Sequence, residues 1–216
     1  MRTFLLLVAM VAWLGGCAII HEPAPSEPGV ANSSAWQVRQ NTLDQFSNWS
    51  LQGRVATGQL LGWTGNLSWR EQAPRFDVRL AGPLGAGGMR AHGTLDRVTI
   101  DTDDGKHFVT DDPDALVEQT LGWSFPLEPL SYWARGLPAP GGYDEISVDE
   151  AGRLRSLTQA GWTVSYLDYT RPSGAPTALP ERIVLDNGDT RIRLVVDRWF
   201  DLKATSGAAT DAGHQN

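Results

Sequence analysis

An alternation of apolar and polar residues is the feature that most constrains the fold of this chain. From Trp49 onward, Leu51, Gly53 and Val55 are spaced by two, and similar short runs recur between turns. Such runs predict strands that are buried on one face. The predicted strands start at residue 49 and cover residues 61–69, 76–80, 89–95, 98–102, 107–110, 145–149, 153–160, 162–169, 181–186 and 190–199.

The connections between these strands predict how they pair. Asn187-Gly188 is a strong hairpin signal, and Asp103-Asp104-Gly105 is a typical turn. Most connections are too short for parallel crossovers, so the strands must be antiparallel. A sheet of that many strands has to curl or close. The predicted fold class is mainly β (α+β): a single curled antiparallel sheet of about eleven strands, with three short helices covering one side.

Three short helices are predicted from their own signals. Trp36, Leu43 and Phe46 are spaced by seven and three residues, which places them on one helical face. Asp112 before Pro113 is typical of a helix start, because aspartate caps free N–H groups and proline suits the first turn. The predicted helices cover residues 36–48, 113–121 and 129–135, and Gly136 suits the left-handed end of the last one.

The first seventeen residues indicate export and lipid attachment. Arg2 precedes an apolar run over residues 4–14, which is too short to be a permanent membrane span and is typical of a secretory signal. Residues 14–17, Leu-Gly-Gly-Cys, resemble the bacterial lipobox, so Cys17 is the predicted lipid anchor. Ala18 resembles an outer-membrane address, which predicts a lipid-anchored protein facing the periplasm. The simpler alternative is an ordinary signal peptide with a chance cysteine.

Composition divides the chain into four parts. We expect a lipoprotein signal peptide over 1–16, a lipidated tether rich in Pro, Ala, Ser and Glu over 17–34, one folded domain over 35–203, and a disordered tail over 204–216. Cys17 is the only cysteine, so no intramolecular disulfide can form. The net charge of −7 argues against nucleic acid as a partner and predicts that any contact with a bilayer is hydrophobic.

Large apolar side chains lie at alternate positions of the predicted strands, on the face expected to point inward. They could simply fill a core, but a curled sheet with few helices could also enclose an apolar cavity, as small barrels do. The residues are Trp63, Leu67, Trp69, Phe76, Val78, Leu80, Phe108, Trp162, Val164, Tyr166, Ile183, Leu185, Ile192, Leu194 and Val196.

The sequence offers no signature of catalysis, a metal or a cofactor, so we do not expect an enzyme. His92 and His107 lie apart without a metal-ligand spacing, and their role is left open. Motifs for nucleophilic serine and for nucleotide phosphates are missing. The acidic residues near turns are interpreted as solvated carboxylates: Asp101, Asp103, Asp104, Asp111, Asp112 and Asp114. These observations limit the function to binding another molecule, transferring it to a partner, or helping an assembly to form.

The loop over residues 81–89 has an unexplained feature. Turn formation accounts for Gly82, Pro83 and Gly85, but nothing in turn chemistry asks for Leu84 in an uncharged loop.

Taken in order, several segments resemble the LolB family of outer-membrane lipoprotein receptors. They are the lipobox at Cys17, the loop Gly82-Pro83-Leu84-Gly85, residues 126–138 with Leu130, Trp133 and Gly136-Leu137-Pro138, and residues 179–199.

The resemblance implies an eleven-stranded open half-barrel closed by helices. It implies that a periplasmic carrier, LolA, delivers lipoprotein cargo, which this protein inserts into the inner leaflet of the outer membrane as a monomer. Pro83, Leu84 and Gly85 would form the membrane-contacting loop. The glycine-rich residues after Leu84 depart from the family pattern. Leu130 and Trp133 would belong to the lid of the acyl-chain cavity. Two alternatives remain at this point: a lipid-anchored carrier of another apolar ligand, and a scaffold lipoprotein of envelope assembly.

Overall fold

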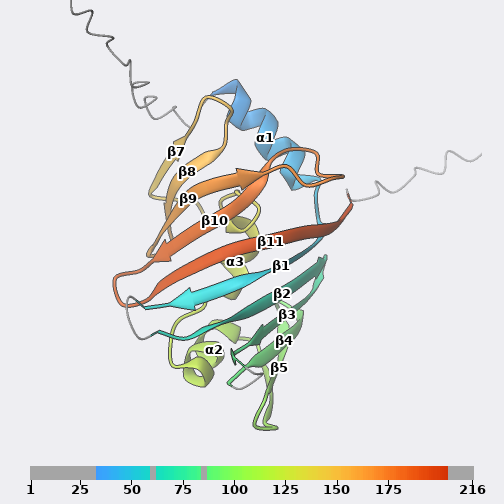
Figure 1. The fold of residues 1–216 in the computed structure, drawn as a ribbon, viewed down its shortest axis with the longest axis vertical. Helices are drawn as coiled ribbons and strands as arrows, with labels where there is room; N and C mark the ends of the chain where they lie inside the picture. The colour runs from blue at the N-terminus through green and yellow to red at the C-terminus, as the bar shows by residue number, and fades with distance from the viewer. Residues whose placement is uncertain (1–32, 59–61, 84–86, 204–216) are drawn as a thin grey trace, which may run out of the picture.

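The computed structural model describes residues 33–58, 62–83 and 87–203, and these ranges form one sheet and three helices (Figure 1). Cys17, Leu84, Gly85, the predicted signal peptide and the predicted tail lie outside the described residues. The elements are α1 (Ser34–Asp44), β1 (Asn48–Thr57), β2 (Thr64–Gln72), β3 (Arg75–Ala81), β4 (Met89–Thr94), β5 (Arg97–Thr102), β6 (His107–Thr110), α2 (Pro113–Leu121), α3 (Leu127–Trp133), β7 (Glu145–Val148), β8 (Leu154–Gln159), β9 (Trp162–Thr170), β10 (Leu179–Asp186) and β11 (Arg191–Lys203).

The sheet confirms the predicted fold class. Its eleven strands follow the order β6-β5-β4-β3-β2-β1-β11-β10-β9-β8-β7, and every neighbouring pair is antiparallel. The edge strands β6 and β7 are consecutive in the chain. The segment that joins them, which contains α2 and α3, therefore has to run from one edge to the other along one face of the sheet (Figure 1).

Two helices differ from their predicted bounds. The predicted helix over 36–48 ends at Asp44, because the guanidinium of Arg135 draws the chain into a turn by binding the carbonyls of Leu43 at 3.2 Å and Phe46 at 2.9 Å. The predicted helix over 129–135 is α3, which starts two residues earlier at Leu127 and ends at Trp133. Gly136 follows with a φ of 81°, the left-handed conformation that the sequence predicts there.

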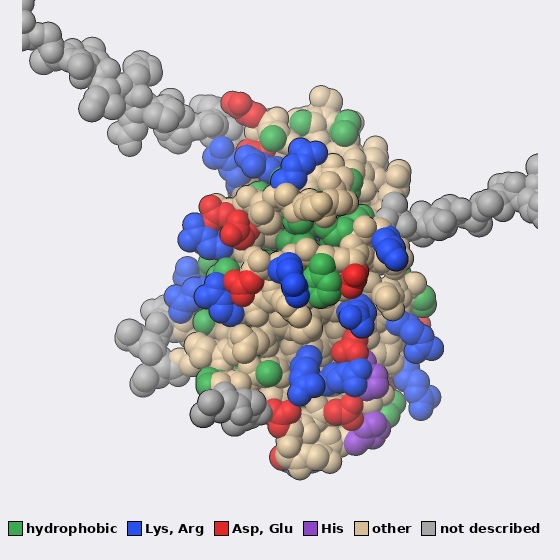
Figure 2. Space-filling view, turned by 45° about the vertical axis from the view of Figure 1, so that its right-hand side comes forward, with side chains coloured by type: hydrophobic (Ala, Val, Ile, Leu, Met, Phe, Trp, Pro, Cys, Tyr) green, Lys and Arg blue, Asp and Glu red, His purple; other side chains and the backbone are tan. Residues whose placement is uncertain are grey.

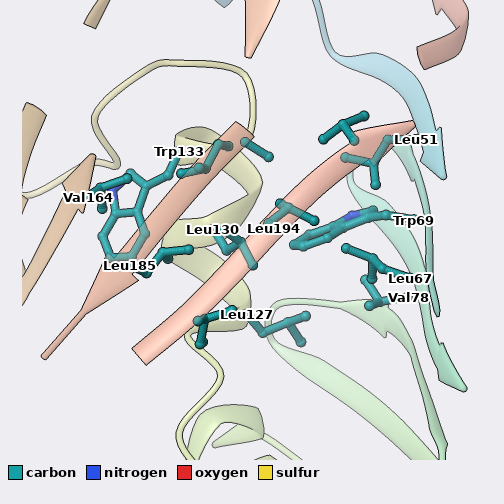
Figure 3. Packing of buried hydrophobic residues seen from close by; sticks show 14 of the residues in the cluster. Leu51, Leu67, Trp69, Val78, Leu127, Leu130, Trp133, Val164, Leu185 and Leu194 are labelled. Atoms are coloured by element: carbon teal, nitrogen blue, oxygen red, sulfur yellow. The ribbon is translucent and has the colours of Figure 1, made fainter. Parts of the chain in front are cut away.

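Helix α3 fills the inside of the curved sheet. Leu127, Leu130 and Trp133 are at most 1% exposed and point towards side chains of β9, β10, β11 and β2 (Figure 3). The short helix thus supplies the second layer that an apolar sheet face needs.

A buried amide fixes the end of α3. The Trp133 indole donates to Gln159 Oε1 at 2.8 Å, and the same oxygen accepts the Ala139 N–H at 2.8 Å. Gln159 Nε2 donates to the Ala139 carbonyl at 2.7 Å, and Tyr166 donates its hydroxyl to the Trp133 carbonyl at 3.1 Å. These bonds satisfy polar groups that would otherwise be costly in an apolar interior.

A tryptophan cluster closes the core beside α1. The Trp49 ring centroid lies 5.6 Å from that of Trp69 and 5.5 Å from that of Trp199. The Trp69 indole donates to Glu71 at 3.0 Å. Burial raises the pKa of Glu71 to about 7, although the Trp69 hydrogen bond and the charge of Arg135 act in the opposite direction.

Glu71→Gln is expected to stabilise the fold above pH 7 and to leave it unchanged near pH 4. In the unfolded chain Glu71 loses its proton near pH 4.5, whereas the folded protein holds it to about pH 7, so stability falls as pH rises across this window. Gln stays neutral and can still accept from Trp69. Urea unfolding at pH 4 and pH 8 should show a gain of up to about 3 kcal/mol at pH 8 alone. An equal gain at both pH values would contradict this account.

Candidate functional site

The structure separates the sixteen predicted cavity residues into two groups. Fourteen are buried in one hydrophobic cluster, and those carried by the strands surround Leu130 and Trp133 of α3. Trp63 and Phe108 are only partly buried and line a cleft. The buried fourteen are Leu67, Trp69, Phe76, Val78, Leu80, Leu130, Trp133, Trp162, Val164, Tyr166, Ile183, Leu185, Ile192 and Leu194. The additional inward residue Val196 is also buried. In this structure α3 therefore occupies the centre of the predicted cavity.

The cleft lies where α2 faces the ends of the strands and has a volume of about 1040 Å³. That size is at the upper end of the roughly 300–1,000 Å³ typical of small-molecule sites. Apolar side chains come from the segment before β2, from β6 and from α2, and polar groups come from the β5–β6 turn and α2. The lining residues are Trp63, Gly87, Gly88, Thr102, Asp103, Asp104, Lys106, Phe108, Leu116, Gln119, Thr120 and Leu121.

An aromatic row supports one wall of the cleft. The Trp63 ring lies 5.8 Å from Trp123, and Trp123 lies 5.7 Å from the buried Phe125 in an edge-on arrangement. The Trp63 backbone is held by Thr57, whose hydroxyl accepts its N–H at 3.1 Å and whose own N–H donates to its carbonyl at 2.8 Å. The cleft thus has a rigid apolar side next to a polar rim.

The part of the cleft lining next to Trp63 is also the base of the loop that contains Leu84. Asp103 Oδ2 accepts the Gly88 N–H at 2.7 Å, and the Asp103 N–H donates to the Gly88 carbonyl at 3.2 Å. A Cβ on Gly88 would lie 2.6 Å from that carboxylate and 2.5 Å from the Leu80 carbonyl, so no larger residue fits. Gly87 has a φ of 66°, which favours glycine. The glycine-rich departure after Leu84 therefore has a structural reason.

A carboxylate connects the two helices that flank the cleft. Asp114 of α2 accepts the Leu127 N–H at the start of α3 at 2.9 Å. Burial raises the pKa of Asp114 to about 6, partly opposed by this hydrogen bond. The interpretation of Asp114 as a solvated turn carboxylate was wrong, because it lies within the first turn of α2 and is partly buried against α3.

Several cleft residues were missed by sequence reasoning. Asp103 and Asp104 were assigned to solvated turns, yet both line the cleft. The role of Asp103 had no local signal, because its partner Gly88 lies fifteen residues away in the chain. Leu116 and Leu121 belong to the predicted helix over 113–121, but nothing in the sequence shows which face of that helix meets the sheet.

The two histidines with no assigned role share one carboxylate on the other side of the sheet. Asp101 binds His107 Nδ1 at 2.7 Å and His92 Nε2 at 3.1 Å, and these hydrogen bonds lower the pKa of Asp101. Within residues 33–58, 62–83 and 87–203, no set of three His, Cys, Asp or Glu side chains could hold a metal ion. Nor is any helix in these ranges long and apolar enough to cross a membrane.

Known proteins resemble this chain over most of its length. A family model described as "Outer membrane lipoprotein LolB" matches residues 47–199. The outer-membrane lipoprotein LolB of Stutzerimonas stutzeri is 38% identical over 197 residues, covering 90% of this chain and 94% of that protein. The LolB of Nitrosococcus oceani is 36% identical over 200 residues, covering 92% of this chain and 96% of that protein. This chain belongs to the LolB family. Among solved structures, the LolA superfamily protein NE2245 of Nitrosomonas europaea has a TM-score of 0.47 and 8% identity, over 80% of this chain and 94% of that chain.

Membership in the LolB family confirms the resemblance drawn from the sequence. The protein is an outer-membrane lipoprotein of protein transport, which receives lipoproteins from LolA and inserts them into the outer membrane. The family consists of receptors and not of enzymes. The two alternative functions, a carrier of another apolar ligand and an assembly scaffold, are thereby set aside. What the family does not assign is the part that each residue of this chain plays.

Trp63→Ala is expected to weaken binding of a fluorescent fatty acid by roughly tenfold, because a buried apolar side chain contributes about 1.5–3 kcal/mol. Tyr143→Ala is the matched control, since Tyr143 is 45% exposed and does not line the cleft. Fluorescence titration measures both affinities, and circular dichroism checks folding. Equal affinities of the two variants would show that the probe does not use the cleft.

Proposed function

We propose that this LolB-family protein accepts the acyl chains of incoming lipoproteins in the cleft and passes them to the bilayer at the Leu84 loop. The observation that carries this proposal is the shared wall: Gly87 and Gly88 line the cleft and also lie at the base of the loop. A chain held in the cleft therefore lies beside the segment proposed to touch the membrane. Pro83, Leu84 and Gly85 form the proposed membrane-contacting loop.

The cleft extends into the predicted cavity only if α3 moves. Leu127, Leu130 and Trp133 occupy the apolar wall that acyl chains would use. Acyl chains would replace one apolar contact by another, so the exchange can be close to balanced in free energy. Such balance suits a receptor, because a cavity that binds acyl chains too tightly cannot release them. We propose the fourteen buried residues as the lining of this extended cavity.

Cys17 is the proposed anchor that keeps the domain at the inner leaflet of the outer membrane. Each buried acyl methylene contributes about 0.8 kcal/mol, so two or more chains hold the protein in place. Burial of Leu84 contributes only about 1.5–3 kcal/mol, which is too little to anchor a protein but enough to orient one that is already held. The proposed working unit is a monomer.

Leu84→Glu is expected to leave folding and cargo acceptance intact while reducing insertion of lipoprotein into vesicles at least tenfold. A charged side chain at the loop opposes entry into the apolar layer. The assay follows cargo from loaded LolA to the protein, and then from the protein to liposomes. Equal insertion by Leu84→Glu and by the unaltered protein would discard the role of the loop.

Asp103→Ala is expected to slow the same insertion step by several fold, because Gly88 loses its carboxylate partner at the base of the loop. Asp103→Asn retains an acceptor oxygen and should preserve most of the rate. Asp96→Ala is a control that removes one exposed acidic residue from the distant β4–β5 turn. Similar rates for the Asp103→Ala and Asp96→Ala variants would argue against coupling between cleft and loop.

A further inference from the structure

Charge is distributed unevenly over the sheet. Strands β1, β2, β3 and β11 carry eight Lys and Arg against four Asp and Glu, whereas the whole chain has 18 against 25. Of those four acids, Glu71 is part of the buried tryptophan cluster. The basic residues of these four strands are exposed and lie on the outer face, which turns away from α3. Figure 2 shows Lys and Arg side chains gathered on one side of the molecule, with several Asp and Glu among them. An acidic protein thus presents one basic surface.

Two of the acidic residues on these strands are already paired with arginines. Asp197 pairs with Arg54 at 2.7 Å, and Asp77 pairs with Arg90. Arg70 and Arg79 are exposed and form no ion pair of their own within the described ranges, although Asp77, the partner of Arg90, also lies opposite Arg70 across the β2–β3 pair.

Arg79 also lies directly opposite Arg90 across the β3–β4 pair, where like charges are unfavourable. A shallow groove of about 350 Å³ is lined by Arg70, Arg79 and Arg90 together with Asp77, and a second groove of about 520 Å³ is lined by Arg79 and Arg198 together with Asp197. This arrangement favours an anionic partner, since guanidinium groups bind phosphate oxygens well.

The outer face lacks the apolar anchors that protein interfaces use. The exposed large hydrophobic residues of the described chain all lie outside β1, β2, β3 and β11: Val38, Leu95, Val109, Tyr143 and Leu167. Centres of protein interfaces are poor in charge and rich in aromatic side chains. A charged face with shallow polar grooves therefore suits a layer of lipid headgroups better than the surface of another protein.

An anionic lipid surface is always within reach of this face if Cys17 is the anchor, as the proposed function has it. Fifteen residues lie between Cys17 and Ser33, and the sixteen residue-to-residue steps can extend about 55 Å. That exceeds the roughly 40 Å width of a domain of this size. The tether thus lets any face meet the leaflet, and electrostatics decides which one does.

We propose that the outer face of β1, β2, β3 and β11 rests on anionic phospholipid headgroups of the leaflet that holds the anchor. Each basic residue near such a surface favours contact by about fivefold, while the acidic remainder of the protein is repelled. This proposal adds an electrostatic contact to the hydrophobic contact predicted from the net charge, because a net charge does not show where the charges lie. The Leu84 loop follows β3, so the headgroup contact and the loop contact are compatible.

The test measures which face of the lipidated protein lies near the headgroups. The mature protein is inserted into vesicles of phosphatidylcholine, with or without about 30% phosphatidylglycerol. Both kinds of vesicle contain a lipid that carries a quencher on its headgroup. A fluorophore is attached at Gln72→Cys, on the outer face at the end of β2 away from the Leu84 loop, or at Glu128→Cys on the exposed side of α3. Lipidation blocks Cys17, the natural cysteine, so each label is unique.

Quenching at residue 72 is expected to exceed quenching at residue 128 severalfold in the anionic vesicles. The excess should vanish in pure phosphatidylcholine, at about 0.5 M salt, and in Arg70→Gln/Arg79→Gln. Arg97→Gln/Arg171→Gln removes the same charge from exposed positions outside the four strands and should keep the excess.

Equal quenching at the two sites, or an excess that ignores lipid charge, would overturn the proposal. A second result would also overturn it: the Arg70→Gln/Arg79→Gln variant no longer binds LolA in detergent, while its quenching on vesicles is unchanged. The outer face would then bind the carrier and not the lipid headgroups. The measurement uses neither cargo nor carrier. Its failure is therefore distinct from failure of the proposed transfer route, which the Leu84→Glu and Asp103→Ala insertion assays test separately.

Discussion

The whole arrangement depends on covering one large apolar sheet face. Eleven strands present inward-facing leucines, valines and tryptophans that have to leave water, and the sheet curls too little to bury them against themselves. The only chain available for this purpose within the described domain, apart from α1 at one end, is the segment between the two edge strands. Its seven-residue helix α3 therefore occupies the inside, and Gln159 and Arg135 fix that helix to the sheet and to α1.

This constraint explains why open space lies beside α2 and not in the middle of the sheet. Side chains of α3 occupy the centre, while the cleft is lined by the β5–β6 turn and one face of α2. In the proposed transfer, side chains of α3 would keep the apolar interior covered until cargo arrives. The hydrogen bond between Asp114 and the start of α3 makes the two flanking helices a continuous unit.

Much of the fold could be predicted from the sequence, because period-two alternation and turn residues are local signals. The bounds of β6 agree at both ends, and Gly136 has its predicted conformation. The location of α3 could not be predicted, since the pattern of Leu130 and Trp133 suits a lid as well as a core. Asp103 and Arg79 were missed for a related reason: their roles depend on neighbours that are distant in the chain or across the sheet. The inner residues were grouped correctly on one face, but whether they enclose space depends on packing that no local pattern encodes.

The pairing of β1 with β11 has a consequence for biogenesis. These two strands lie next to each other in the middle of the sheet, so within the sheet the half formed by β2 to β6 joins the half formed by β7 to β10 through the first and last strands. Contacts between distant parts of a chain form late, because loop closure is entropically costly. The domain cannot complete its sheet until the final strand has been synthesised. This delay favours a chain that stays unfolded during export, and an unfolded chain can pass through a narrow translocation pore.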